Sequence, residues 1–292
     1  MGEHGEEPMP LAAVLAALDL EQTDSDTFVG TSLPQLHGRV YGGQVLAQAL
    51  LAAGRTMDPG RLPHSVHGYF LRPGSLEDPI TFAVERLRDG RSFSARRTHA
   101  LQSGKPILSM IASFQSEQPG LEHADPMPEV PEPESLPSSV ALFNSLDHPV
   151  AQFFYRNGAF DLRHVSGNLF TGPAAEHSDR QFLWMRARAP IPGDQLQQRA
   201  MLAYACDQVM LEPIMRRHGL SWMTREASVA SLDHAMWWHR DVDAGEWLLF
   251  AQSSPSARGG RGLGEAKVFD RSGSLVATIA QEGMLRVPQG QG

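Results

Sequence analysis

The chain has 292 residues, which is long for one small core and enough for two domains of about 150 residues each. Its hydrophobic content is 41% and its charged content is 20%, both ordinary for a globular protein. The 25 basic and 33 acidic residues give a net charge of −8, which excludes a global attraction to nucleic acid or to an anionic membrane. The single cysteine, Cys206, excludes an intramolecular disulfide and a cysteine-based zinc site, and it fits a reducing compartment.

The N-terminal residues and the apolar runs indicate where the protein works. Residues 1–7, Met-Gly-Glu-His-Gly-Glu-Glu, are acidic and do not have the pattern of a signal peptide. No stretch approaches the roughly 18 consecutive apolar residues that a membrane-spanning helix requires. We therefore expect a soluble, cytoplasmic protein without a membrane or nucleic-acid partner.

The first part of the chain has a pattern typical of an α+β fold. Residues 10–19 are predicted to form a short helix, and a turn-rich, extended segment follows to about residue 40. A second helix, rich in small residues, is predicted at 42–54, where glycines open and close it. Strands separated by turn sequences are then predicted at 64–72, 80–88, 93–102 and 106–115. One long helix followed by a meander of strands differs from the βαβ alternation of a parallel sheet.

A segment rich in proline and acidic residues divides the chain. It covers residues 117–139, so we predict a first half at 1–116, an extended linker at 117–149 and a second half at 150–292. The second half is predicted to contain a long helix at 194–216 and strands at 160–166, 181–189, 227–239, 246–254, 261–270 and 274–286.

The two halves resemble each other weakly, which predicts two copies of one fold arranged as a dimer within one chain. His67–Phe70 matches the place of His234–Trp237 in this alignment. In the last strand of each half, Gln281 is expected to correspond to Ser113 or Gln115.

Three polar residues of the second half lie in otherwise apolar segments. Asp207 is the only acid in the run 201–211, where an unpaired carboxylate would be costly, and the first half has no acid at the equivalent place. Ser231 and Gln281 lie in apolar predicted strands. Together the three supply a base, a hydroxyl and an amide, which could hold a water against an acyl carbon. A structural ion pair for Asp207 and ordinary strand hydrogen bonds for the other two remain open, and Asp233 is a rival acid because strand alternation places it on the face of Ser231.

Other residues carry weaker signals for binding. Gly43 opens a helix whose backbone N–H groups could bind an anion, although close packing explains it equally well. Basic residues of the first half could bind phosphates or form a solvated face: Arg86, Arg88, Arg91, Arg96, Arg97 and Lys105. The pairs His64/His67 and His234/His239 match no standard zinc spacing, and the sequence has no nucleotide-binding fingerprint and no Gly-x-Ser-x-Gly motif. We therefore expect neither a metal nor a cofactor.

Four motifs stand out for their length: Tyr41-Gly-Gly-Gln44, His64–Gly74, Arg88–Arg97 and Leu232–His239. They resemble the type II acyl-CoA thioesterases, the TesB-like family, and the likeness runs from about residue 25 to residue 287. The resemblance implies a double hotdog fold, in which each half is an antiparallel sheet wrapped around a central helix. It also implies hydrolysis of medium- or long-chain fatty acyl-CoA to free acid and coenzyme A, and assembly of the chain into a homo-oligomer, a dimer or a tetramer.

The resemblance also implies site residues. The catalytic acid, hydroxyl and amide of the family fall by motif on Asp207, Ser231 and Gln281. Asp207 would either activate a water as general base or attack directly to form an anhydride, and the sequence leaves both routes open. In such a dimer-like chain the first half would supply groups that bind the acyl-CoA, which we predict to include Gly43, His67, Arg96 and Arg97.

Two other functions fit the same fold. The first is an acyl-CoA-binding or regulatory module without turnover, and the presence of all three polar residues argues against it. The second is a hydratase or dehydratase with a His/acid pair. His234 and Asp233 are sequential strand neighbours that should face opposite ways, which argues against that pair.

Overall fold

A computed structural model describes residues 10–222, 224 and 227–287 of the chain. The first half contains the elements α1 (Pro10–Leu18), β1 (Glu21–Asp24), β2 (Thr27–Gly30), α2 (Gly42–Arg55), β3 (Arg61–Phe70), β4 (Ile80–Asp89), β5 (Phe93–Gln102) and β6 (Lys105–Ser116). The connecting segment contains the 3-10 helix η1 (Pro133–Ser135) and α3 (Ser139–Ser145). The second half contains α4 (Pro149–Asn157), β7 (Phe160–His164), β8 (Arg180–Ala187), α5 (Gln195–Cys206), α6 (Glu212–Arg217), β9 (Ser228–Ser231), β10 (Asp233–Trp238), β11 (Leu248–Arg258), β12 (Arg261–Asp270) and β13 (Leu275–Arg286).

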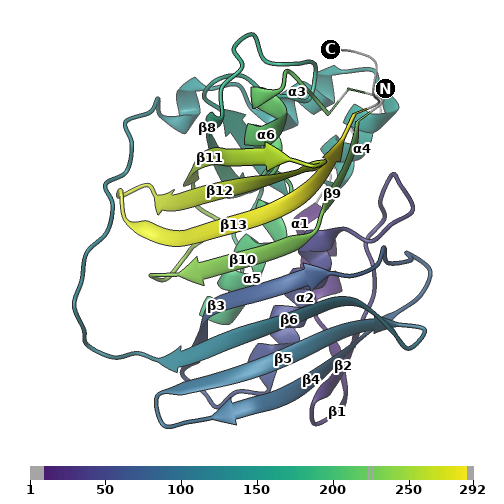
Figure 1. Cartoon of the computed structure of the whole chain (residues 1–292), viewed down its shortest axis with the longest axis vertical. Coiled ribbons are helices and arrows are strands. Elements are labelled where there is room, and N and C mark those ends of the chain that lie inside the picture. Colours follow the sequence, from purple (N-terminus) through teal and green to yellow (C-terminus); the bar gives the residue numbers. More distant parts are fainter. Residues whose placement is uncertain (1–9, 223, 225–226, 288–292) are drawn as a thin grey trace, which may run out of the picture.

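One continuous antiparallel sheet joins the two halves (Figure 1). Its strands lie in the order β1-β2-β4-β5-β6-β3-β10-β13-β12-β11-β8-β7, and β9 pairs with β13 beside β10. The halves meet where β3 pairs with β10, with His67 opposite Ala235. The two predicted sheets are therefore joined edge to edge, so that neither β3 nor β10 leaves an open edge.

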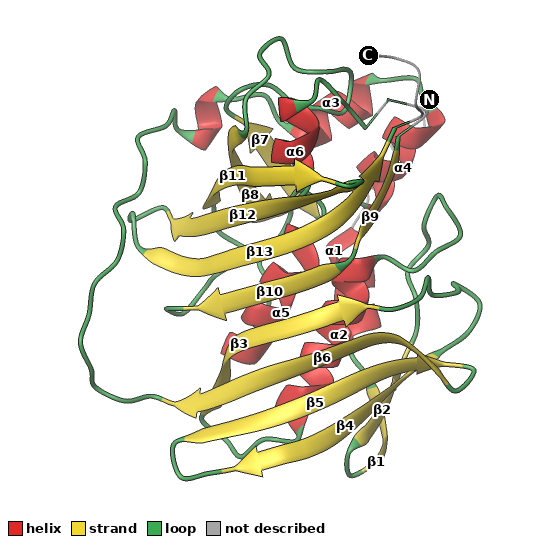
Figure 2. Ribbon diagram, viewed as in Figure 1, coloured by secondary structure: helices red, strands yellow, loops and turns green. Residues whose placement is uncertain are grey.

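The helices α2 and α5 lie side by side on one face of this sheet (Figure 2). They run antiparallel, because Gly43 at the start of α2 lies against Tyr204 near the end of α5, while Gly54 lies against Leu196. A Cβ at Gly54 would come within 2.5 Å of the Leu196 side chain, so the glycine permits the close approach. Each half is thus an antiparallel sheet around one central helix, as expected for a double hotdog.

The backbone shows which residues of the two halves correspond. In each half a β-strand ends where two successive N–H groups donate to one carbonyl: Leu71 and Arg72 to Ile107, and His239 and Arg240 to Val276. Counting along the paired strands from these points, His234 corresponds to Val66 and Gln281 to Ala112. All four of these residues are buried.

The sequence-based alignment of the halves was therefore wrong in detail. It matched His234 with His67 and Gln281 with Ser113 or Gln115, whose side chains lie on the opposite face of the sheet. Because side chains alternate between the two faces of a strand, a shift by one residue exchanges buried and exposed positions.

The predicted helix at 194–216 is two helices. Helix α5 ends at Cys206, residues 207–211 form turns, and α6 begins at Glu212. Pro213 gives the reason, since it has no N–H to donate to Val209 and its ring clashes with the carbonyl four residues earlier. The Val209 carbonyl instead accepts hydrogen bonds from the Glu212 N–H at 3.1 Å and from the side-chain amide of Gln252 at 3.0 Å. The break leaves Asp207 at the end of α5.

Further segments differ from the prediction. Helices α3 and α4 were not predicted, and the range 227–239 contains two strands, β9 and β10. The hairpin of β1 and β2 lies in the segment expected to be turn-rich. It was not predicted because strands of four residues each give little alternation to recognise. Part of the predicted linker packs on the sheet face turned away from α5, where Met127, Val130 and Leu136 cover a buried cluster that includes Trp184. The Trp184 Nε1–H donates to the carbonyl of Pro131 at 3.0 Å, so this part of the linker is fixed to the second half.

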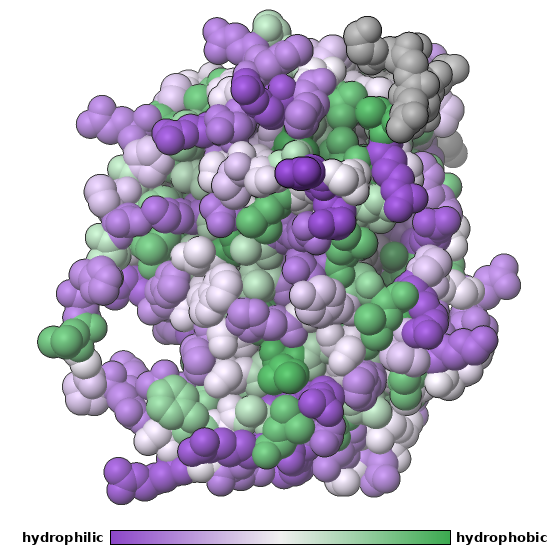
Figure 3. Space-filling model, in the orientation of Figure 1, coloured by the Kyte–Doolittle hydropathy of each residue, from purple (hydrophilic) through white to green (hydrophobic). Residues whose placement is uncertain are grey.

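The face of the sheet turned away from α2 and α5 has a mixed surface, on which hydrophilic and hydrophobic residues are interspersed (Figure 3). Among the helices that the structure describes, none is both long enough and apolar enough to cross a bilayer.

Candidate active site

Asp207 lies directly after the central helix of the second half. It is the C-cap residue of α5, with φ −59° and ψ −21°. Its Oδ1 accepts hydrogen bonds from Ser231 Oγ and Gln281 Nε2, both at 2.8 Å, and its Oδ2 accepts the Gly43 N–H at 2.8 Å. The donors come from β9, β13 and α2, so the carboxylate joins the second half to the first.

Ser231 and Gln281 meet because their strands are neighbours. Ser231 pairs with Gly283 of β13, and Gln281 lies two residues away on the same side of that strand. The Gln281 amide also donates to Ser231 Oγ at 2.6 Å. Gln281 is fully buried, while Asp207 and Ser231 are half-buried. The structure thus brings the three predicted residues into mutual contact.

The first half reaches this site through the start of α2. The N–H of Gly43 is one of the donors that a helix N-terminus leaves unpaired, and the local helix dipole favours a negative charge there. A Cβ at Gly42 would lie 2.8 Å from Asp207 Oδ2, and a Cβ at Gly43 would overlap the carbonyl oxygen of Tyr204. The glycines are therefore required for the close contact between the halves.

Tyr41 supports the same contact. Its hydroxyl donates to the Tyr204 carbonyl at 2.6 Å. Burial and the charge of Asp207 raise the pKa of Tyr41 well above its ordinary value, so the hydroxyl keeps its proton.

His234 was not among the predicted site residues, yet it touches Gln281. Its Nδ1 lies 2.6 Å from Gln281 Oε1, and its Nε2 lies 3.3 Å from the Sγ of Cys206. Burial lowers the pKa of His234, which keeps the imidazole neutral, although the charge of Asp207 acts in the opposite direction. Burial and the same charge raise the pKa of the Cys206 thiol well above its ordinary value.

A slip in strand pairing explains why sequence reasoning missed His234. The pairing of Ser231 with Gly283 and of Ala235 with Ala280 differs by one residue in register. Strict alternation places Asp233 on the face of Ser231, but the slip places His234 there instead. Asp233 accepts the backbone N–H of Glu282 at 2.7 Å, so the rival acid holds the irregular backbone.

Of the four residues predicted to bind substrate, the structure brings only Gly43 to this site. His67 is exposed on the other face of the sheet, where its ring meets Trp237 edge-to-face at 5.0 Å. Arg96 is 1% exposed, and it donates to Thr56 Oγ1 at 2.9 Å and to Asp89 at 2.7 Å. Its guanidinium is thus occupied inside the first half.

Arg97 lies on the same outward-facing side of the sheet as His67. It forms an ion pair of 3.0 Å with Glu85 at a site open to solvent. Successive residues of a strand face opposite ways, so Arg96 and Arg97 could not both line one phosphate site on this sheet.

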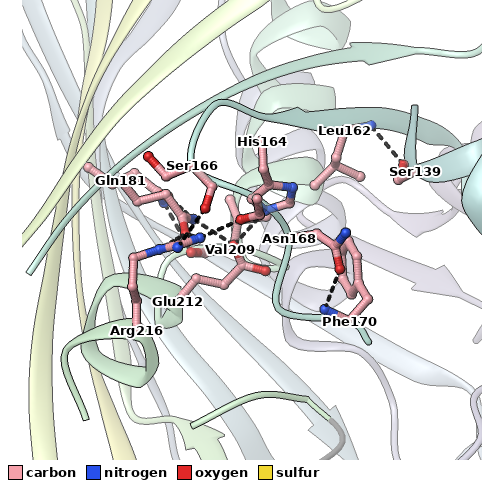
Figure 4. Close-up of polar contacts among 12 residues, drawn as sticks. Ser139, Leu162, His164, Ser166, Asn168, Phe170, Gln181, Val209, Glu212 and Arg216 are labelled. Carbon is pink, nitrogen blue, oxygen red and sulfur yellow. Dashed lines mark hydrogen bonds and ion pairs between the residues drawn. The ribbon is translucent and has the colours of Figure 1, made fainter. Parts of the chain in front are cut away.

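A second buried polar cluster holds the turn that follows Asp207 (Figure 4). Glu212 of α6 accepts hydrogen bonds from Gln181 at 2.5 Å, His164 at 2.8 Å and Trp222 at 2.9 Å. Burial alone would raise the pKa of Glu212, but His164 and the three hydrogen bonds lower it below its ordinary value. Gln181 also bonds Gln252, whose amide holds the Val209 carbonyl within the turn.

Two surface cavities lie away from Asp207. The larger, of about 370 Å³, is lined by residues of the second half that include Gln195, Asp243 and Trp247. The smaller, of about 260 Å³, lies between α1, Arg55 and the segment before α5. Neither includes Asp207, Ser231 or Gln281. Among the described residues, no group of three or more His, Cys, Asp or Glu side chains is placed to hold a metal ion.

Both halves match one protein family. Residues 32–115 match the acyl-CoA thioesterase N-terminal domain, and residues 122–285 match the acyl-CoA thioesterase C-terminal domain. The chain belongs to the acyl-CoA thioesterase family. It is 36% identical to acyl-CoA thioesterase 2 of Haemophilus influenzae, over 92% of this chain and 95% of that protein. It is also 36% identical to human acyl-coenzyme A thioesterase 8, over 98% of this chain and 93% of that protein.

Solved structures agree with this membership. The acyl-CoA thioesterase II TesB2 of Mycobacterium marinum is 41% identical, with a TM-score of 0.78 over 95% of this chain and all of that one. A hot dog protein of Alicyclobacillus acidocaldarius is 20% identical but has a TM-score of 0.77, over 94% of this chain and 98% of that one. The predicted α+β double hotdog fold and the predicted class of enzyme, a thioester hydrolase, are confirmed.

Proposed function

We propose that this thioesterase hydrolyses medium- and long-chain fatty acyl-CoA, with Asp207, Ser231 and Gln281 as its catalytic residues. The observation that carries the proposal is the contact of a carboxylate, a hydroxyl and an amide at the junction of the halves. Such a set can orient a water and accept its proton, and thioester cleavage requires no metal ion because a thiolate leaves readily.

Asp207 has room for one further hydrogen bond. An ionised carboxylate offers about four lone-pair positions, and the donors Ser231, Gln281 and Gly43 occupy three of them. A water in the fourth position would give its proton to Asp207 while its oxygen attacks the acyl carbon. The tetrahedral intermediate then breaks its C–S bond, and the coenzyme A thiolate leaves and takes up a proton.

Three hydrogen bonds hold the Asp207 carboxylate in one orientation, in which we propose that it acts as a general base on water. Multiple turnovers in H₂¹⁸O test for an anhydride that water opens at the enzyme carbonyl. Water that attacks the acyl carbon, in the thioester or in an anhydride, labels only the fatty acid. Recovery of ¹⁸O in the peptide that contains Asp207 would indicate an anhydride opened at the enzyme carbonyl.

The activity itself is tested by thiol release from acyl-CoA of increasing chain length. We expect release from medium- and long-chain substrates, undiminished in EDTA. If acyl-CoA binds but no thiol is released at any chain length, the protein is a non-catalytic acyl-CoA-binding protein. Assembly into a homo-oligomer, a dimer or a tetramer, stays a prediction and is measured by light scattering.

A further inference from the structure

The orientation of the Gln281 amide decides whether the proposed site can work. Only its Nε2 can donate to Asp207 Oδ1 and Ser231 Oγ, at 2.8 and 2.6 Å. A rotation of the amide by 180° would place Oε1 against the carboxylate, where two acceptors repel each other. A donor at the other end of the amide would add to the hold on this orientation.

His234 is the group at that end. It is 1% exposed on β10, and its Nδ1 lies 2.6 Å from Gln281 Oε1. Because Oε1 can only accept, Nδ1 must carry a proton. Burial lowers the pKa of His234, so the other ring nitrogen, Nε2, carries none.

Cys206 completes the arrangement. Its Sγ lies 3.3 Å from His234 Nε2, and burial together with the charge of Asp207 keeps the thiol protonated. The Sγ also lies 3.4 Å from the Ala203 carbonyl oxygen, and when the S–H donates to Nε2 it favours the tautomer with the proton on Nδ1. The charged residues near the imidazole are Asp207 and Asp233.

We propose that His234 is a positioning residue, whose Nδ1–H holds the Gln281 amide so that it donates to Asp207 and Ser231. The chain of contacts runs from Cys206 through His234 and Gln281 to Asp207. This inference rests on the proposed function, because it assigns His234 a role in presenting Gln281 to the proposed base.

A nucleophilic Cys–His pair is the competing interpretation, and the structure opposes it. Cys206 is fully buried, and its thiol pKa is raised, whereas a reactive cysteine is partly exposed and has a lowered pKa.

Substitutions at one position separate positioning from packing. In His234→Asn the side-chain NH₂ replaces the Nδ1–H donor, whereas His234→Leu fills the space without a donor. We expect His234→Leu to lower kcat by about 10- to 100-fold with little change in KM, as a misplaced catalytic group does. His234→Asn should retain kcat within about 5-fold of the wild type, since the donor is kept.

Val66 provides a matched control. It is the buried residue of the first half that corresponds to His234, and its side chain offers no N–H donor to Gln281. Val66→Ala should lower Tm without the fall in kcat per folded molecule. Equal kcat in His234→Leu and the wild type, or a greater loss in Asn than in Leu, would overturn the proposal.

The tautomer is read independently of activity. The imidazole ¹⁵N shifts of the wild-type protein distinguish a protonated Nδ1 from a protonated Nε2, and the signal that disappears in His234→Asn identifies the residue. We expect a neutral ring protonated on Nδ1, and a proton on Nε2 alone would overturn the proposal.

The Asp207→Asn variant, assayed alongside, separates the two levels of inference. Full activity in Asp207→Asn would reject the proposed catalytic site. An inactive Asp207→Asn together with full activity in His234→Leu would reject only the positioning role of His234.

Discussion

Each half has a corner, formed by the residue after its central helix and the strand positions that face it. The two corners have the same backbone pairing but different side chains. In the second half the residue after the central helix is Asp207, and the paired strands supply Ser231, His234 and Gln281. The corresponding positions of the first half hold Thr56, Pro63, Val66 and Ala112. The first corner therefore has no carboxylate, strand hydroxyl or amide at these positions, although its backbone pairing is the same.

The space at each corner is also filled differently. Gln281 pairs with Gly264 on β12, where a Cβ would overlap the carbonyl oxygen of Met210. Ala112 pairs with Arg96 on β5, and that side chain lies buried against Thr56. The second corner thus accommodates the turn that carries Asp207, and the first is closed by an arginine. A duplicated fold can lose one site to structure while that half still supplies Gly43 to the other.

The largest effect should come from Asp207, the group that the first half lacks. We expect Asp207→Asn to lower kcat on acyl-CoA by about 10²-fold or more, because a general base is lost while the shape is kept. The measurement is thiol release under saturating substrate, with Tm as a check on folding.

Thr56 is the matched control for Asp207, since it follows the other central helix. Thr56→Ala should lower Tm, because Arg96 loses a partner, while kcat per folded molecule stays near the wild-type value. A loss of kcat in Thr56→Ala as large as in Asp207→Asn would show that both corners are needed for catalysis.

Ser231 and Gln281 should show the next largest effects. We expect Ser231→Ala and Gln281→Ala each to lower kcat by about 10- to 100-fold, because each side chain bonds both Asp207 and the other. In the double variant the losses should be far from additive if the residues act on one water. Fully additive losses would instead indicate two independent roles, and the assay is again thiol release.

Arg96 should affect stability and leave catalysis intact. We expect Arg96→Met to lower the free energy of unfolding by about 2–3 kcal/mol, because Thr56 and the carbonyl groups around the buried guanidinium lose their donor. The loss should stay below the full cost of breaking a buried ion pair, since Asp89 is 55% exposed. Denaturant unfolding measures this change.

Substrate comparison completes the test of Arg96. The kcat/KM per folded molecule should be unchanged both on acyl-CoA and on a short thioester without the nucleotide phosphates. A rise in KM confined to acyl-CoA would instead indicate that Arg96 binds the phosphates of coenzyme A, as the sequence suggested.

Glu212 holds the turn at residues 207–211 in place, and its contribution to stability should depend on pH. Its pKa is lowered below the ordinary value of 4.5, so its ionised form stabilises the fold above that pH. The contribution is lost as the pH falls through the lower, folded-state pKa. We expect Glu212→Gln to cost about 1.5 kcal/mol near pH 7 and progressively less below pH 4.5. Tm measured against pH for both proteins checks this, and a constant difference down to pH 3 would contradict it.

Local sequence patterns predicted most of the strands because these strands are long and bounded by turns. Strand β12 was predicted at 261–270 and found at Arg261–Asp270. The break at Asp207 was missed although Pro213 signals it, because the apolar run 201–211 favours a continuous helix. His234 was missed because the register slip after Ser231 depends on pairing with β13, a contact between segments about 50 residues apart that local alternation cannot contain.

The smallest effect should come from Arg97, the neighbour of Arg96 on β5. The two arginines are alike in sequence, but Arg97 lies on the outer face and forms an ion pair with Glu85 at a solvent-exposed site. Exposed pairs of this kind contribute about 0–1 kcal/mol, so Arg97→Ala should leave Tm almost unchanged. Its KM for acyl-CoA should stay within about 2-fold of the wild-type value, since the outer face is separated from Asp207 by the sheet. A several-fold rise in KM for acyl-CoA, absent for the truncated thioester, would instead place the phosphates of coenzyme A on the outer face of the first half. The pair Arg96→Met and Arg97→Ala therefore tests whether adjacent arginines on one strand divide into interior support and solvent-exposed surface.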